Sequence, residues 1–247
     1  MTEYEECGQI IKKHLPLCEK AFSSLPLKNR RAAWAVLALF HQADQLADLT
    51  ELALFEQAAD AFLTGTSPGG FLWEALSDAR RQFTLEEEPF CEFIAGQKQD
   101  REKETYDELD ELLMYAYQTG GAIGLLILPI CARRNQEKLR NAAVSLGVAI
   151  QLTRLLRDIE TDERQKKRLP RQVMKQFGYT EEELSSHTVN KAFINVWEYI
   201  AFEAEAYYEE AAEAMPLFPL YSQTAINELA SRYQTQLKEI RNRLSQA

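Results

Sequence analysis

Apolar residues recur at steps of three and four along almost the whole chain, and this spacing constrains the fold most. In RRAAWAVLALFHQADQLADL (residues 30–49), the residues Ala33, Leu37, Phe40 and Asp44 follow it. Residues with this spacing share one face of an α-helix. Alternating runs of β-branched residues and Asn-Gly turns, the usual signs of strands and hairpins, are almost absent. We therefore predict an all-α protein.

The connections between the predicted helices are short. Helix-breaking residues occur at Pro26, at TSPGG (66–70), at Pro89, at Pro170 and at PLFPL (216–220). No internal repeat or low-complexity linker divides the chain, and 247 residues fit one large domain. We predict a single domain over residues 1–247, built as a helical bundle.

The charge of the chain limits its partners. A formal net charge of −10 argues against a nucleic-acid partner, and an anionic substrate would need a cation between it and the protein. The N-terminus is acidic and polar, and the apolar run AIGLLILPICA is shorter than the roughly 20 residues that span a bilayer. We expect a cytoplasmic protein, with contact to a membrane surface left open. Four cysteines without C-x-x-C spacing agree with a reducing compartment: Cys7, Cys18, Cys91 and Cys131.

Two aspartate pairs have the same spacing, Asp44 with Asp48 and Asp158 with Asp162. In a helix, residues four apart lie one turn apart on one face, where like charges repel. A divalent cation removes this repulsion, and Mg²⁺ prefers oxygen ligands that are completed by substrate phosphates. We predict that these four carboxylates hold Mg²⁺. The alternative is that each pair lies on a solvated helix face.

Three glycines interrupt one predicted helix, at Gly120, Gly121 and Gly124 in YAYQTGGAIGLL. Each costs about 1 kcal/mol relative to alanine in a helix, so a close approach to the backbone is indicated. Tight helix packing and a ligand channel explain this equally well. A basic cluster at residues 164–168 is explained by a helix end, where the dipole favours cations, or by a flap over a bound diphosphate.

Several segments resemble the squalene/phytoene synthase family. LGVAIQLTRLLRDIETD resembles its second aspartate-rich region, and AWAVLALFHQADQLAD resembles the first. EPFCEFIAGQKQD, YAYQTGGAIG and YQTQLKEIR are similar to other family segments in the same order. The resemblance implies an isoprenoid-synthase bundle around a central cavity, with Mg²⁺ as cofactor and prenyl diphosphates as substrates. It implies no obligatory protein partner.

The resemblance also implies roles for individual residues. The aspartates that match the Mg²⁺ and diphosphate positions are Asp44, Asp48, Asp158 and Asp162, and Asp100 matches a further functional aspartate. Positions that line the diphosphate or the cavity are matched by His14, Tyr115, Gln151 and Tyr233. The channel for the hydrocarbon tail is matched by Phe22, Leu37, Gly120, Ile123 and Gly124.

Three residues depart from the family pattern. Gln45 replaces an aspartate of the first motif, His41 replaces an arginine, and Arg154 replaces an asparagine. A neutral imidazole does not match the charge or the fork geometry of a guanidinium. Arg154 adds a permanent cation, which would pair with Asp158, occupy a metal position or grip a phosphate. We expect such changes to damage one of the two diphosphate subsites that the family's synthases use.

Our leading hypothesis is therefore Mg²⁺-dependent hydrolysis of a prenyl diphosphate, with farnesyl diphosphate converted to farnesol. The chain resembles divergent bacterial members that act as farnesyl diphosphate phosphatases. One alternative is a head-to-head synthase that makes squalene, dehydrosqualene or phytoene. The other is a non-catalytic member that binds prenyl lipids or serves as a scaffold.

Overall fold

The computed structural model describes residues 2–46, 48–159, 161–162, 165 and 167–246, and these residues form helices and no strand. The all-α prediction is confirmed. In chain order the elements are α1 (Glu3–His14), α2 (Pro16–Phe22), α3 (Leu27–Asp44), α4 (Leu49–Leu63), α5 (Phe71–Gln82), α6 (Glu88–Glu102), α7 (Leu109–Ala116), the π-helix η1 (Tyr117–Gly121), α8 (Ala122–Cys131), α9 (Gln136–Asp158), α11 (Arg171–Phe177), α12 (Glu181–Ser185), α13 (Lys191–Glu213), the 3₁₀ helix η2 (Met215–Leu217) and α14 (Leu220–Leu244).

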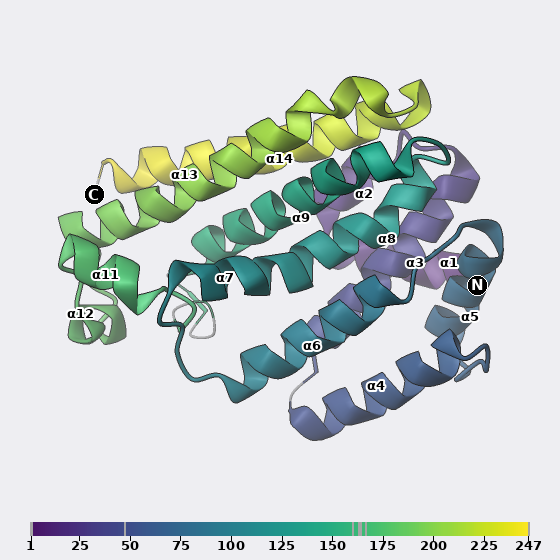
Figure 1. Ribbon diagram of the computed structural model, residues 1–247, viewed down its shortest axis with the longest axis horizontal. Helices are drawn as coiled ribbons and strands as arrows, with labels where there is room; N and C mark the ends of the chain where they lie inside the picture. The colour runs from purple at the N-terminus through teal and green to yellow at the C-terminus, as the bar shows by residue number, and fades with distance from the viewer. Residues whose placement is uncertain (1, 47, 160, 163–164, 166, 247) are drawn as a thin grey trace.

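The long helix α9 occupies the middle of the molecule (Figure 1). It packs against α13 and α14 on one side and against η1 and α8 on the other. The buried apolar residues form two clusters, one centred on α1 to α6 with α8, the other on α7, α11 and α13. Since α9 and α14 supply residues to both clusters, they join the two parts of the bundle.

Glycines allow α9 to approach η1 and α8 closely. A Cβ on Gly124 would lie 2.0 Å from the carbonyl oxygen of Ala143, and one on Gly120 would lie 2.3 Å from that of Gly147. Real Cβ atoms do not come so near a backbone oxygen, so these positions accept only glycine without a shift of one helix. Tight helix packing, the first of the two explanations for the glycines, is confirmed.

The stretch Leu109–Cys131, which joins α7, η1 and α8, is long and apolar enough to cross a membrane by length and composition. However, 61% of its most apolar window is buried inside the protein. Its neighbours are α9, α3 and α6. A core position explains its apolar character, since a helix that is apolar on all sides is buried in protein or in lipid.

Candidate active site

Two adjoining cavities lie between α2, α3, α6, α9 and α14. One is polar and about 640 Å³ in volume, and the other is apolar and about 120 Å³. We call them the head chamber and the tail tunnel. Six residues line both, so the two cavities share a boundary: Leu15, His41, Asp44, Gln151, Arg154 and Tyr233.

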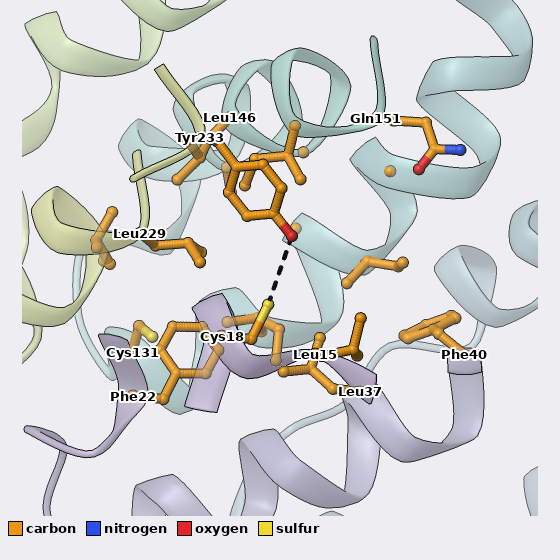
Figure 2. Close-up of a pocket in the computed structure, with 18 of the residues that line it drawn as sticks. Leu15, Cys18, Phe22, Leu37, Phe40, Cys131, Leu146, Gln151, Leu229 and Tyr233 are labelled. Carbon is orange, nitrogen blue, oxygen red and sulfur yellow. Dashed lines mark hydrogen bonds between the residues drawn. The ribbon is translucent and has the colours of Figure 1, made fainter. Parts of the chain in front are cut away.

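The tail tunnel contains the residues that were predicted to line a hydrocarbon channel. Phe22 comes from α2, Leu37 from α3, and Gly120, Ile123 and Gly124 from η1 and α8. Figure 2 shows Phe22 and Leu37 pointing into the same space as Leu229 of α14. At the end near the head chamber, the thiol of Cys18 faces the hydroxyl of Tyr233 at 4.0 Å (Figure 2). The glycines therefore serve both helix packing and a channel.

The head chamber is lined by cations and carboxylates in similar numbers. Its cationic side chains are Arg101, Arg154, Arg157, Lys167 and Arg168, and its carboxylates are Asp44, Asp100, Asp158 and Asp162. A chamber of mixed charge suits a diphosphate, whose oxygens accept hydrogen bonds from arginine and share metal ions with carboxylates.

Asp44, the last residue of α3, meets Arg154 of α9 across the chamber. A guanidinium nitrogen of Arg154 lies 3.3 Å from Oδ2 of Asp44, and Gln97 donates to Oδ1 at 2.9 Å. Burial alone would lower the pKa of Arg154, but the charge and hydrogen bond of Asp44, together with Tyr233 and Tyr115, raise it. Of the three outcomes considered for Arg154, pairing with Asp158 is wrong, because Asp44 is its partner in the structure.

Asp48 does not share a helix face with Asp44, so that part of the prediction is wrong. Helix α3 ends at Asp44, and Asp48 is the exposed N-cap of α4. Its Oδ1 accepts the backbone N–H groups of Thr50 and Glu51 at 2.8 and 2.9 Å. Asp48 lines neither cavity. Aspartate strongly prefers the N-cap position of a helix, and at Asp48 this preference outweighs continuation of α3. A role for it as a metal ligand stays a prediction.

Asp158 and Asp162 do lie one helical turn apart. Asp158 is the last residue of α9, and the backbone N–H of Asp162 donates to its carbonyl oxygen at 2.8 Å. Both residues line the head chamber. Arg157 binds the carboxylate of Asp158 with two nitrogens, at 2.6 and 2.5 Å. The predicted geometry of this second pair is confirmed.

Asp100 is buried, with 6% exposure, and both of its carboxylate oxygens are bound. Arg168 donates to Oδ1 at 2.7 Å and to Oδ2 at 2.5 Å, and the hydroxyl of Tyr106 donates to Oδ1 at 3.2 Å. Burial alone would raise the pKa of Asp100, but the hydrogen bonds and charge of Arg168 outweigh it and lower that pKa. The geometry gives Asp100 an anchoring contact with the chain that follows the second aspartate pair.

The remaining predicted residues line the head chamber, and His41, Gln151 and Tyr233 line the tail tunnel as well. The rings of His14 and His41 stack with centroids 4.3 Å apart. Burial, followed by the charge of His14, lowers the pKa of His41. Gln151 donates to the hydroxyl of Tyr115 at 3.3 Å, and burial raises the pKa of Tyr115 to about 12.

Two contributors were missed by sequence reasoning. Arg168 belongs to the basic cluster at residues 164–168, and residues 163, 164 and 166 lie outside the described residues. Yet Arg168 is buried against Asp100, and its guanidinium carbon lies 4.5 Å from the ring centroid of Tyr115. The sign of its burial in the sequence was that Arg168 follows a polar stretch and comes directly before Leu169 and Pro170. Gln97, which holds Asp44, carried no signal in the sequence.

The donor set of the chamber suits Mg²⁺ held partly by substrate. Among the described residues, no group of three or more His, Cys, Asp or Glu side chains forms a ready-made metal site. Mg²⁺ in phosphate-binding sites is commonly held by one or two carboxylates together with phosphate oxygens and waters. Asp158 with Asp162 on one wall, and Asp44 on another, provide such partial sets.

Comparison with known proteins agrees with this geometry. The profile of the squalene/phytoene synthase family matches residues 17–246. Farnesyl diphosphate phosphatase YisP of Bacillus subtilis (strain 168) is 56% identical over 239 residues, which cover 96% of this chain and 88% of that protein. Phytoene synthase 1 of Zea mays is 30% identical over 222 residues, which cover 84% of this chain and 54% of the maize protein, so the chain spans about half of its length.

Solved structures give the same result. The crystal structure of YisP aligns with a TM-score of 0.84 at 52% identity and covers 98% of this chain and 87% of that one. A dehydrosqualene synthase in complex with a ligand aligns with a TM-score of 0.92 at 30% identity, with the same coverage of 98% and 87%. The profile match spans nearly the whole sequence, and the bundle encloses a polar chamber that adjoins an apolar tunnel. The chain belongs to the squalene/phytoene synthase family.

Proposed function

We propose that this protein hydrolyses farnesyl diphosphate to farnesol in a reaction that depends on Mg²⁺. The observation that carries the proposal is that the polar head chamber and the apolar tail tunnel adjoin and share six lining residues. A prenyl diphosphate has the same division, with an anionic head and an apolar tail. The relationship to YisP, a farnesyl diphosphate phosphatase, supports the same substrate and reaction.

Different side chains of the chamber would bind different parts of the diphosphate head group. Arg154 stands at the junction of the two cavities, where the first phosphate of a bound substrate belongs. Its planar guanidinium group suits phosphate oxygens. Negative charge develops on the diphosphate as it departs, so the contacts of Arg154 with it become stronger and would accelerate cleavage. The apolar walls of the tunnel exclude water from the tail but leave the junction open to the polar chamber.

The family processes prenyl diphosphates and generally depends on divalent metal ions. Asp44, Asp158 and Asp162 are the residues that would hold Mg²⁺ here. Mg²⁺, when bound, neutralises negative charge on phosphate oxygens. The carboxylates in turn orient the head group toward the junction. Chelation of divalent ions should abolish turnover, and addition of Mg²⁺ should restore it.

Water is the nucleophile that the site leaves available. Hydrolysis adds one water across the ester linkage between the prenyl group and the diphosphate, and the products are farnesol and diphosphate, which carries the second proton of the water. The pairing of Arg154 with Asp44 places a cation within the head chamber, and His41 supplies no permanent charge. Both features favour the use of one diphosphate rather than two.

Product analysis tests this proposal directly. Purified protein is incubated with C10, C15 and C20 prenyl diphosphates and Mg²⁺, and farnesol from the C15 substrate is the expected main product. Water labelled with ¹⁸O distinguishes the two possible sites of attack. Attack at carbon places the label in farnesol, and attack at the phosphorus bonded to the prenyl oxygen places it in the released diphosphate.

Head-to-head coupling is the second candidate, because a phytoene synthase and a dehydrosqualene synthase are among the relatives at 30% identity. The assay with farnesyl diphosphate is therefore run with and without NADPH. A C30 hydrocarbon as the main product would establish the synthase reaction and exclude the phosphatase proposal.

A further inference from the structure

The five arginine and lysine side chains of the head chamber already have acceptors inside the protein. Three of them bind carboxylates: Arg154, Arg157 and Arg168. The other two, Arg101 and Lys167, donate to backbone carbonyl oxygens. A diphosphate that enters the chamber therefore competes with protein acceptors for each of these cations.

Three of the glutamines that line the chamber are also bound at both ends of the side-chain amide. The amide nitrogen of each donates to a tyrosine or an aspartate, and the amide oxygen accepts from an arginine. These glutamines are Gln97, Gln151 and Gln165. Each of these amides therefore holds the chamber wall together before any ligand binds.

Gln236 of α14 lines the same chamber without such partners. Its Oε1 is buried and accepts no hydrogen bond from the described residues. A buried acceptor without a partner destabilises the folded protein. Its Nε2 is not one of the buried atoms that lack a partner, and no described residue accepts a hydrogen bond from it. This nitrogen is therefore an accessible donor on the wall of the chamber.

The position of Gln236 follows from the order of the lining residues along α14. Leu229 lines the tail tunnel, Tyr233 lines both cavities, and Gln236 lines the head chamber alone. Gln236 is three residues beyond Tyr233, on the same face of the helix and about 4.5 Å further along its axis. On α9, which packs against α14, Arg154 lines both cavities and Arg157 lines the chamber alone. Gln236 is thus one turn beyond the junction, where the second phosphate of a bound head group belongs.

We propose that Gln236 binds the distal phosphate of the substrate through its amide nitrogen. A side-chain amide carries two N–H donors that suit phosphate oxygens, and no carboxylate has to be displaced to release them. Because the amide is neutral, it does not repel the Mg²⁺ that Asp158 and Asp162 would hold. The inference rests on the proposed function for the identity of the substrate, whereas the group that Gln236 recognises is the diphosphate itself.

Binding of inorganic diphosphate in the presence of Mg²⁺ tests the inference without turnover. In isothermal titration calorimetry of the full chain, Q236M should bind diphosphate about tenfold more weakly than the wild type, because a hydrogen bond to a charged group is lost. Its KM for farnesyl diphosphate should rise by a similar factor. Q236E should bind more weakly still, because a carboxylate repels the diphosphate. Q234M is the matched control, since Gln234 lies on the same helix and lines neither cavity.

Thermal unfolding of the unliganded protein separates ligand binding from a structural role. Methionine has a similar length and no polar end, so Q236M removes the unpartnered oxygen. Its unfolding midpoint should equal that of the wild type or exceed it by about 2–4 °C. A midpoint several degrees lower would show that Gln236 is required for the fold and would overturn the inference.

The binding measurement decides the remaining outcomes. An affinity of Q236M for diphosphate equal to that of the wild type overturns the inference, and so does a wild type that binds no diphosphate. A wild type that binds diphosphate through Gln236 but releases no farnesol from farnesyl diphosphate contradicts the proposed hydrolysis and leaves the role of Gln236 supported.

Discussion

The two aspartate pairs have the same spacing and different structures. At Asp158 the helical turn continues, since the N–H of Asp162 donates to the carbonyl oxygen four residues earlier. At Asp44 the helix ends instead. The backbone N–H of Gln45 donates to the carbonyl oxygen of Gln42, and the chain has left α3 before Asp48 caps the start of α4. The second pair presents both carboxylates to the head chamber, and the first presents only Asp44.

The difference shows that four-residue spacing defines a shared face only where the chain stays helical. Aspartate competes with helix interiors and favours N-caps, because its side chain binds nearby backbone N–H groups. Asp48 is followed three residues later by Glu51, the spacing of a capping box. That signal was present in the sequence and indicates a new helix start at Asp48.

The largest expected effect concerns the chain after the second pair, which Asp100 anchors. In D100N the guanidinium of Arg168 stays buried without its carboxylate, and we expect a loss of about 3–5 kcal/mol in the free energy of unfolding, measured by denaturant titration. The folded-state pKa of Asp100 is lowered, so its contribution is present above the unfolded pKa of about 4 and is lost as pH falls through the folded value. D100N should therefore flatten the acid limb of the stability curve.

A double variant controls for the buried charge. Replacement of both partners, D100N/R168M, removes the charge as well as the pair, so most of the stability should return. A double variant that is as unstable as D100N would contradict this account. Next to the first aspartate pair, Arg101 donates instead to the backbone carbonyl oxygens of Ala43 and Leu46, at 3.1 and 3.0 Å.

Removal of a chamber carboxylate should have the next largest effect. We expect D158N and D44N each to lower kcat/KM for farnesyl diphosphate about 100-fold to 1,000-fold, because each carboxylate would hold Mg²⁺ that stabilises the charge developing on the diphosphate. The Mg²⁺ concentration needed for half-maximal rate should rise in both variants. Steady-state kinetics over a series of Mg²⁺ concentrations would measure this. Unchanged turnover and Mg²⁺ dependence would instead favour the non-catalytic alternative.

Much of the site could be predicted because it depends on residue type at helical spacing. Phe22, Leu37 and Ile123 line the tunnel as the family resemblance implied. The resemblance placed Tyr115 and Gln151 in the head chamber correctly. What failed depended on the end of a helix, where one hydrogen bond decides whether the chain continues, as at Asp48.

Partners across the chamber could not be predicted, because pairing depends on tertiary geometry. Arg154 is one turn from Asp158 along α9, yet its ion pair is with Asp44, 110 residues away. Arg157, adjacent to Asp158, takes the partner that spacing had suggested for Arg154. Side-chain direction between two helices is set by their packing, and a single sequence does not contain it.

Arg154 lies on α9, which carries Asp158 of the second aspartate pair, and it binds Asp44 of the first pair. Its replacement therefore tests the comparison between the two pairs. We expect R154Q to raise KM for farnesyl diphosphate about tenfold to 100-fold, because a charge-assisted contact with phosphate is lost. R154K keeps the charge without the fork and should fall between R154Q and the wild type. Initial-rate kinetics at saturating Mg²⁺ separate KM from kcat. A loss confined to kcat in both variants would place Arg154 outside substrate binding.

The smallest effect belongs to Asp48, and two substitutions separate its possible roles. Asparagine caps a helix as well as aspartate does, whereas alanine does not. If Asp48 only caps α4, D48N should keep both stability and turnover, and D48A should lose about 1 kcal/mol in the free energy of unfolding. If Asp48 also binds Mg²⁺, D48N should lose turnover while it keeps stability, because the neutral amide is a poor substitute for a carboxylate ligand. Thermal unfolding and kinetics of the two variants, measured side by side, therefore decide whether the first pair acts through one aspartate or two. Since Asp48 lines neither cavity, we expect the capping result.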